Sequence, residues 1–103
     1  MDYANYLKLR ELLSLQEMES TKHGKVAHDE MLFIIIHQAY ELWFKQIHHE
    51  LDLIQSIFGG AAVDDAQLGR AVHAAERIVK IEQLLVGQID ILETMTPMDF
   101  LEF

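Results

Sequence analysis

The sequence predicts an all-α fold, built as a bundle of long helices. Two segments, about 29–58 and about 64–95, repeat apolar residues every three or four positions, as the buried face of a helix does. The apolar parts of both segments contain no proline, and their only glycines are Gly69 and Gly87. No stretch alternates apolar and polar residues cleanly enough to indicate a strand. We therefore expect residues 1–103 to form a single all-α segment.

An N-terminal arm and short helix are expected over about residues 1–16. Leucines follow two tyrosines there, in a pattern closer to that of a helix than to that of a strand. The residues of this pattern are Tyr3, Tyr6, Leu7, Leu9, Leu12, Leu13 and Leu15. The next segment, 17–29, holds Ser20, Thr21 and Gly24 but few apolar residues, which predicts an exposed connection.

The first long helix has clear start and stop signals. Asp29 can cap its N-terminus, and Glu30 suits the positive end of the helix dipole. Gly59 and Gly60 follow Phe58 and are expected to stop the helix. At 1.5 Å per residue the helix would be about 44 Å long. Its apolar residues extend around much of the circumference, so we expect further helices, partner subunits or both to surround it.

The second long helix also has a start signal, because Asp64 or Asp65 can act as its N-cap. Beyond its end, Thr96, Pro97 and Asp99 have the residue types of the first positions of a helix. We therefore expect a further helix to begin at Thr96.

Composition and charge narrow the class of protein. Of the 103 residues, 50% are hydrophobic and 24% are charged, which is typical of a chain that folds around a core. A net charge of -9 would repel nucleic acids and anionic membrane surfaces. The uncharged stretch between Glu30 and Glu41 is shorter than the roughly 20 residues of a membrane span, and the N-terminus does not resemble a secretory signal. These features predict a cytoplasmic protein that binds neither nucleic acid nor membrane.

Phe33 and His37 are the first candidates for a binding site. They lie four residues apart and so share one face of the first long helix, on which Tyr40 and Phe44 continue the row. A histidine at such a position is often a core residue that bonds to a backbone carbonyl or a neighbouring side chain. The alternative is a base or hydrogen-bonding group in a pocket lined by aromatic residues. The spacing leaves both interpretations open.

The six histidines do not have the spacing of a metal site. His48 and His49 are adjacent, so they point about 100° apart on a helix and cannot chelate one ion as residues one turn apart would. No glutamate stands three residues before any histidine, so the pair that builds di-iron bundles is absent from the sequence. Without cysteine, a thiolate metal site and a disulfide framework are excluded as well.

Three stretches resemble the haem-dependent tryptophan 2,3-dioxygenase family. The string HDEMLFIIIHQAYELWFKQIHHELD resembles the family's most recognisable segment, YANYLKLRELLSLQ resembles its opening, and LETMTPMDFLEF resembles a later motif. The resemblance covers essentially all 103 residues but only the N-terminal part of a family member. It implies an all-α, usually homotetrameric enzyme with a haem cofactor. Such enzymes insert both atoms of dioxygen into the indole ring of L-tryptophan, giving N-formyl-L-kynurenine in the kynurenine pathway of tryptophan catabolism.

The resemblance also implies roles for individual residues. His37 matches the histidine on the distal side of the haem that hydrogen-bonds the indole nitrogen, and Phe33 matches the aromatic residue that packs on the substrate beside it. Phe100 falls where the family places an aromatic residue near the substrate. Three further positions match residues that reach from one subunit towards a neighbour's active site. They are Tyr3, Tyr6 and Leu7.

Two functional groups of the family have no counterpart in these 103 residues. The arginine that binds the substrate carboxylate would follow Phe103, and none of the six histidines matches the proximal histidine that ligates the haem iron. The chain alone is therefore expected to hold no metal ligand and to be inactive. Two alternatives remain: a truncated homologue that serves as a helical oligomerisation module, and a related haem-dependent aromatic oxygenase.

Overall fold

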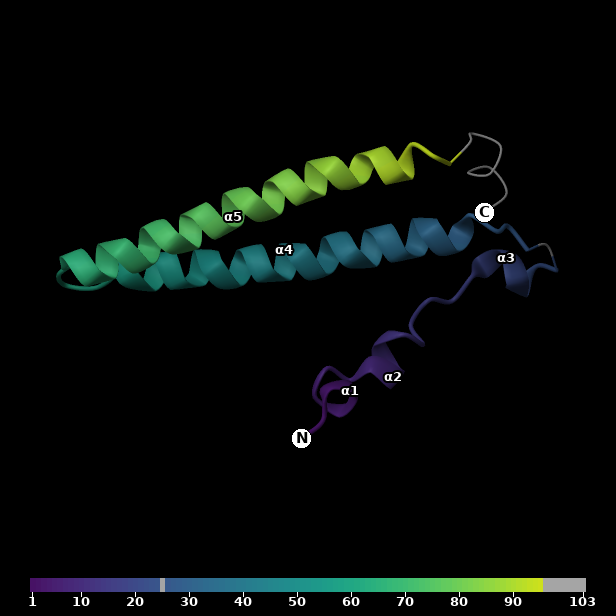
Figure 1. The fold of residues 1–103 in the computed structure, drawn as a ribbon, viewed down its shortest axis with the longest axis horizontal. Coiled ribbons are helices and arrows are strands. Elements are labelled where there is room, and N and C mark those ends of the chain that lie inside the picture. Colours follow the sequence, from purple (N-terminus) through teal and green to yellow (C-terminus); the bar gives the residue numbers. More distant parts are fainter. Residues whose placement is uncertain (25, 96–103) are drawn as a thin grey trace. The chain divides into compact units, whose positions relative to one another are not determined.

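The computed structural model describes residues 1–24 and 26–95, and all regular structure in this part of the chain is helical (Figure 1). This confirms the all-α prediction. The helices are α1 (Tyr3–Tyr6), α2 (Leu9–Leu12), α3 (Glu19–Lys22), α4 (Glu30–Phe58) and α5 (Asp65–Leu92). The chain divides into two compact units, a first unit of Met1–His37 together with the residues from Leu92 onward, and a second unit of Gln38–Ile91. The helix expected to begin at Thr96 lies outside the described residues.

The second unit is an antiparallel helical hairpin, formed by the larger part of α4 and nearly all of α5 (Figure 1). Helix α4 ends at Phe58, where the N–H of Gly59 donates to the Gln55 carbonyl at 2.8 Å. A Cβ at position 59 would lie 3.0 Å from that carbonyl oxygen, which explains why glycine is preferred there. Helix α5 begins at Asp65, after Asp64 caps it by accepting a hydrogen bond from the N–H of Gln67 at 2.8 Å.

Small and branched side chains form the core of the hairpin. The buried residues of α5 repeat at helical spacing, and two of them are alanines, which allow the two helices to approach closely. They are Ala71, Ala74, Ile81 and Leu85. The Tyr40 hydroxyl donates to the Leu85 carbonyl at 2.6 Å and so joins α4 to α5. Helix α5 ends at Leu92, three residues before the end expected from its apolar pattern.

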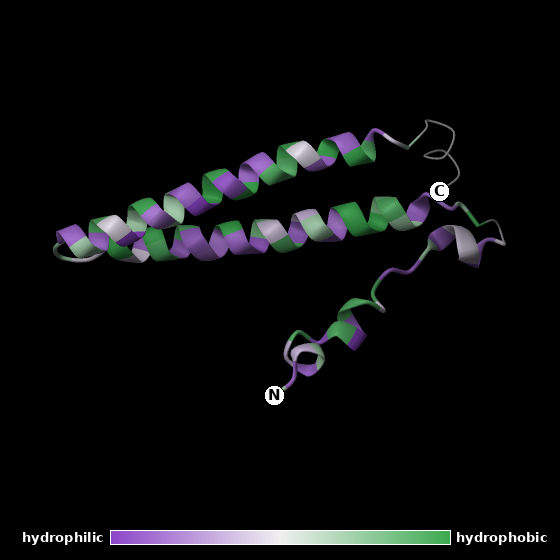
Figure 2. Cartoon of the chain, viewed as in Figure 1, coloured by the Kyte–Doolittle hydropathy of each residue, from purple (hydrophilic) through white to green (hydrophobic). Residues whose placement is uncertain are grey.

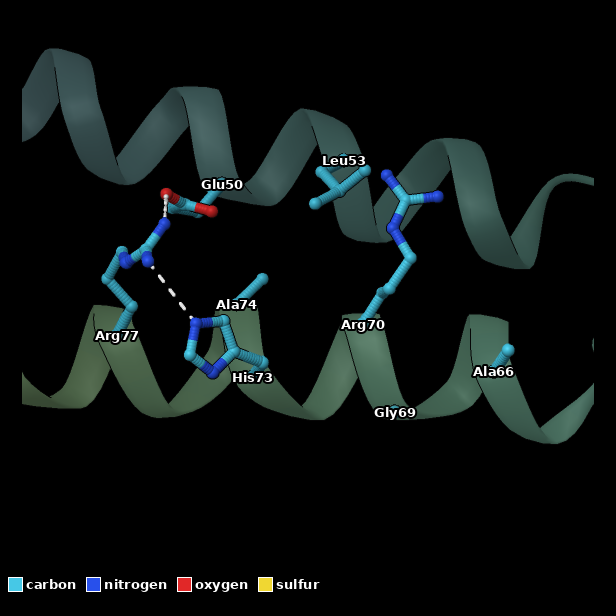
Figure 3. Close-up of a pocket in the computed structure, with 8 residues that line it drawn as sticks. All are labelled: Glu50, Leu53, Ala66, Gly69, Arg70, His73, Ala74 and Arg77. Carbon is cyan, nitrogen blue, oxygen red and sulfur yellow. Dashed lines mark hydrogen bonds and ion pairs between the residues drawn. The ribbon is translucent and has the colours of Figure 1, made fainter.

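A buried carboxylate also joins the two helices of the hairpin. Glu50 is only 4% exposed and accepts hydrogen bonds from Arg77 Nη1 at 3.1 Å and from Gln46 Nε2 at 2.7 Å (Figure 3). The Arg77 hydrogen bond outweighs the effect of burial and, with Gln46, holds the pKa of Glu50 below its ordinary value of 4.5. Because the folded state lowers this pKa, the pair stabilises the fold above pH 4.5, and the contribution is lost as the pH falls through the lowered value.

Replacing Arg77 by alanine should therefore destabilise the hairpin by about 1 to 2 kcal/mol at pH 7, because Glu50 would keep its charge and lose its charged partner. The difference from the wild type should shrink in acid, where Glu50 becomes protonated. Urea unfolding of the full-length protein at pH 7 and at a series of lower pH values measures both effects. Arg70→Ala is the matched control, since it removes the same charge from the same helix, where Arg70 donates to the uncharged Gln67 side chain at 3.4 Å. Equal losses for the two variants would contradict the role of the buried pair.

The first unit begins with two helical turns instead of the single short helix expected over about 1–16. Helices α1 and α2 contain four residues each and are separated by Leu7 and Lys8. The φ of Lys8, +53°, lies in the left-handed region. A left-handed residue interrupts the hydrogen-bond pattern of a right-handed helix, so the chain changes direction there. The Asp2 side chain caps α1 by accepting from the N–H of Asn5 at 2.8 Å.

The expectation that residues 17–29 form an exposed connection is wrong in part. The segment contains α3, and Ser20 and Ala27 are each only 3% exposed. The physical reason is a hydrogen-bonded contact with the start of α4, where Glu30 accepts from the backbone and side chain of Ser20. A serine that appeared to belong to a polar loop is therefore buried.

Apolar residues lie on several sides of the long helices, as expected from the sequence, and recur as green segments along both of them (Figure 2). Many of these side chains are exposed in the chain by itself. Among them are Ile35, Leu42, Trp43, Leu51, Phe58, Leu68, Val72, Val79, Leu84 and Ile89. Within the described residues no helix is both long enough and apolar enough to cross a membrane.

Candidate functional site

Phe33 and His37 form a ring pair in the first two turns of α4. Their ring centroids are 4.2 Å apart and the ring planes are inclined by 33°. The four-residue spacing places the two side chains one above the other on the same helix face, as the sequence predicted. Phe33 is half-buried and His37 is exposed. The pair therefore presents an apolar ring and an imidazole side by side at the surface of this unit.

The hydrogen bond of His37 fixes which ring nitrogen carries the proton. Nδ1 lies 2.7 Å from the backbone carbonyl oxygen of Phe33. A carbonyl oxygen can only accept, so in the neutral imidazole Nδ1 is the N–H donor and Nε2 is the acceptor. Both interpretations of His37 that the sequence left open therefore hold in part. Within the described residues a backbone carbonyl bonds to Nδ1, while the side chain is exposed. Nε2 is suited to accept a hydrogen bond from a ligand N–H.

The rest of the aromatic row lies in the second unit. The Tyr40 and Phe44 rings stack with centroids 6.0 Å apart, and the Tyr40 hydroxyl donates to the Leu85 carbonyl. Tyr40 therefore serves the packing of the hairpin. Phe33 and His37 are the members of the row that pair an apolar ring with a hydrogen-bonding side chain outside the hairpin.

The other residues assigned by resemblance lie on α1 or beyond the described part of the chain. Tyr3, Tyr6 and Leu7 are all exposed at or next to α1, with Tyr3 at 75% exposure. Large apolar side chains that are left exposed in this way are suited to contact another part of the protein or another subunit. Phe100 lies outside the described residues.

A groove in the second unit, lined by both charged and apolar residues, is the other candidate for ligand binding. Figure 3 shows Arg77 between Glu50 and His73, with Arg70 further along α5. Arg77 Nη2 lies 3.2 Å from His73 Nε2, so Arg77 donates to this nitrogen as well as to Glu50. The groups at the centre of the groove are thus used in mutual hydrogen bonds that stabilise the hairpin. Among the described residues, no three histidine, aspartate or glutamate side chains gather as a metal site would require.

Sequence reasoning missed one polar cluster close to the ring pair. Glu30 was expected only to suit the helix dipole, and Ser20 was placed in an exposed loop. In the structure the two side chains are buried against each other, 2.5 Å apart between Ser20 Oγ and Glu30 Oε1. The sequence feature that could have indicated this contact was a carboxylate at the first position of the expected helix, with a serine in the segment that precedes the helix.

Comparisons with known proteins give a consistent result. A family model described as tryptophan 2,3-dioxygenase matches residues 1–103. The chain is 58% identical to a tryptophan 2,3-dioxygenase of Dictyostelium discoideum and 55% identical to one of Bdellovibrio bacteriovorus, in each case over 98% of its own length. It is 50% identical to the corresponding protein of Xenopus laevis, also over 98% of its length. These matches cover 25%, 28% and 25% of the respective relatives, so the chain spans about a quarter of their length.

Proposed function

The chain belongs to the tryptophan 2,3-dioxygenase family, and from this membership we propose that it forms the substrate-side, N-terminal quarter of a haem-dependent enzyme that converts L-tryptophan to N-formyl-L-kynurenine. One structural observation supports the proposal most directly: the ring of Phe33 lies beside an imidazole whose Nε2 is an acceptor. An indole is largely apolar with a single N–H donor. The pair on α4 has the complementary groups.

In the proposed complex, His37 and Phe33 orient the substrate. The indole N–H donates to His37 Nε2, while the His37 Nδ1–H remains bound to the Phe33 carbonyl and keeps the imidazole in the required tautomer. The Phe33 ring packs on the indole and excludes water from one side of it. These two contacts determine how the substrate ring is presented to dioxygen.

The residues described here fit the distal side of a haem pocket. Haem, when bound, supplies the iron that activates dioxygen. The half-buried Phe33 and the exposed His37 provide an apolar ring and a hydrogen-bond acceptor, which are groups that a substrate above the haem requires. We place the axial histidine and the group that binds the substrate carboxylate in the remaining three-quarters of the protein.

Oxygen isotope incorporation tests the proposed reaction. The full-length, haem-loaded protein should consume L-tryptophan and dioxygen, and under ¹⁸O₂ the product should carry both labelled atoms. Mass spectrometry of the product measures this. Incorporation of a single labelled atom would overturn the assignment and favour a related haem-dependent aromatic oxygenase.

We further propose a cytoplasmic homotetramer, in which α1 contributes to a neighbouring subunit's site. The exposure of Tyr3, Tyr6 and Leu7 in the chain by itself supports the contact with a neighbouring subunit, because these side chains then have apolar surface available for a partner.

Replacing both Tyr3 and Tyr6 by alanine should raise the KM for L-tryptophan several-fold, because the neighbour's pocket would lose two aromatic contacts. Haem content and helix content should remain unchanged. Steady-state kinetics with absorbance and circular dichroism spectra measure these three quantities. The matched control is Leu13→Ala with Leu15→Ala, which also truncates two exposed apolar side chains near the N-terminus. A wild-type KM in the tyrosine variant would refute the intersubunit role.

A second candidate function is a helical oligomerisation module that lacks catalysis. The exposed apolar residues of α4 and α5 favour it, since such surfaces usually pack against other helices. The mass of the natural gene product separates the two functions. A product about four times the length of this chain supports the enzyme, whereas one of about this length supports the module.

A further inference from the structure

A buried carboxylate anchors the start of α4. Glu30 is the first residue of the helix and is only 4% exposed. Its Oε2 accepts from the Glu19 N–H at 2.7 Å, and its Oε1 accepts from the N–H and the hydroxyl of Ser20 at 2.9 and 2.5 Å. The Ser20 hydroxyl in turn accepts from the Ala27 N–H at 3.1 Å. We call Ser20, Ala27 and Glu30 the latch.

The latch holds a charged group. Burial opposes ionisation of Glu30, but the hydrogen bonds from Ser20 and from the Glu19 N–H outweigh it and lower the pKa of Glu30 below its ordinary value. Its position at the positive end of the helix dipole favours the same charge state. A carboxylate with several short hydrogen bonds holds its donors more firmly than a neutral group would. The latch therefore fixes the start of α4 against Glu19 and Ser20 of α3.

Glu30, the latch residue that belongs to α4, lies on the same face of this helix as the ring pair. Phe33 is three residues beyond Glu30 and His37 is seven residues beyond it, which corresponds to one and two helical turns. The first turn of a helix has unpaired N–H groups and frays readily. The Phe33 carbonyl, which holds His37 Nδ1, comes at the end of that turn. If the turn frayed, the bond that sets the His37 tautomer would be lost.

From this arrangement we propose that Ser20 and Glu30 are positioning residues for indole recognition, which keep the first turn of α4 intact so that His37 presents Nε2 to the substrate N–H. The inference rests on the proposed function. It extends the site beyond the ring pair, because the latch residues act through the helix backbone and need no contact with substrate.

The test compares two substrates in the full-length, haem-loaded enzyme. L-tryptophan has the indole N–H, and 1-methyl-L-tryptophan lacks it. Ser20→Ala should lower the ratio of kcat/KM for L-tryptophan to kcat/KM for 1-methyl-L-tryptophan by about three- to tenfold, the size of one hydrogen bond. Ser14→Ala is the matched control, because it removes an exposed hydroxyl that donates to the Glu11 carbonyl at 2.7 Å, and it should leave the ratio unchanged.

Two further variants keep the proposal falsifiable. Glu30→Gln retains the shape of the side chain but removes its charge, so it should lower the ratio even if Ser20→Ala fails to fold. His37→Ala gives the reference value of the substrate ratio for a site that lacks the hydrogen-bond acceptor. If the substrate ratio falls in His37→Ala but is unchanged in Ser20→Ala and Glu30→Gln, the positioning role of Ser20 and Glu30 is wrong. The proposed function would still stand. If the latch variants lose kcat/KM equally for both substrates, the latch has a purely structural role, and the proposed positioning role is again wrong. An unchanged ratio in His37→Ala would instead contradict the proposed function.

Discussion

Replacing His37 by alanine in the full-length, haem-loaded protein should lower kcat/KM for L-tryptophan about tenfold, the equivalent of one hydrogen bond of about 1.4 kcal/mol. The indole N–H would lose the Nε2 acceptor, while the Phe33 ring would still pack on the substrate. The substitution should leave the fold intact, because the His37 side chain is exposed and its hydrogen bond is to a backbone carbonyl of its own helix. Steady-state kinetics and circular dichroism measure the two effects.

His48→Ala provides the control for this experiment. His48 is an exposed histidine on the same helix, which we interpret as a surface residue. Its removal should leave kcat/KM unchanged. If His37→Ala has wild-type turnover with L-tryptophan, the assignment of His37 to the substrate is wrong.

The long helices could be predicted from the sequence because their signals are local. Asp64 caps α5 and Gly59 ends α4 through contacts within four residues, so residue type and spacing suffice to find them. The apolar surface of α4 also follows from periodicity alone. Packing partners are not local, which is why the sequence could not show that the Tyr40 hydroxyl joins α4 to α5.

The N-terminal region could not be predicted to the same degree. The break between α1 and α2 depends on a left-handed conformation at Lys8, a residue type that gives no signal for it. The burial of Ser20 depends on Glu30, ten residues further along the chain. Composition describes such a segment as polar and exposed, because it cannot show that one carboxylate will satisfy several of its donors.

The sequence predicted which residues of the candidate site share a helix face, but not the His37 tautomer or the contacts that support the site. The four-residue interval places Phe33 and His37 together on any helix, and the structure has them as a ring pair. The tautomer of His37 required the position of the Phe33 carbonyl, and the latch required a contact across a loop. The roles of these residues towards tryptophan rest on family membership and stay predictions until the variants are measured.

The 103-residue chain by itself should have no dioxygenase activity and should self-associate. Large apolar side chains of α4 and α5 are exposed in it, and contiguous apolar surface is rarely left in contact with water. Added haem should bind without a defined axial histidine, since we assign His37 to the substrate side. Absorbance spectra of the chain with haem, size-exclusion chromatography and an assay with L-tryptophan measure these outcomes. A histidine-ligated ferrous haem that converts L-tryptophan would contradict the assignment and transfer the axial role to one of the other histidines, His23, His28, His48, His49 or His73.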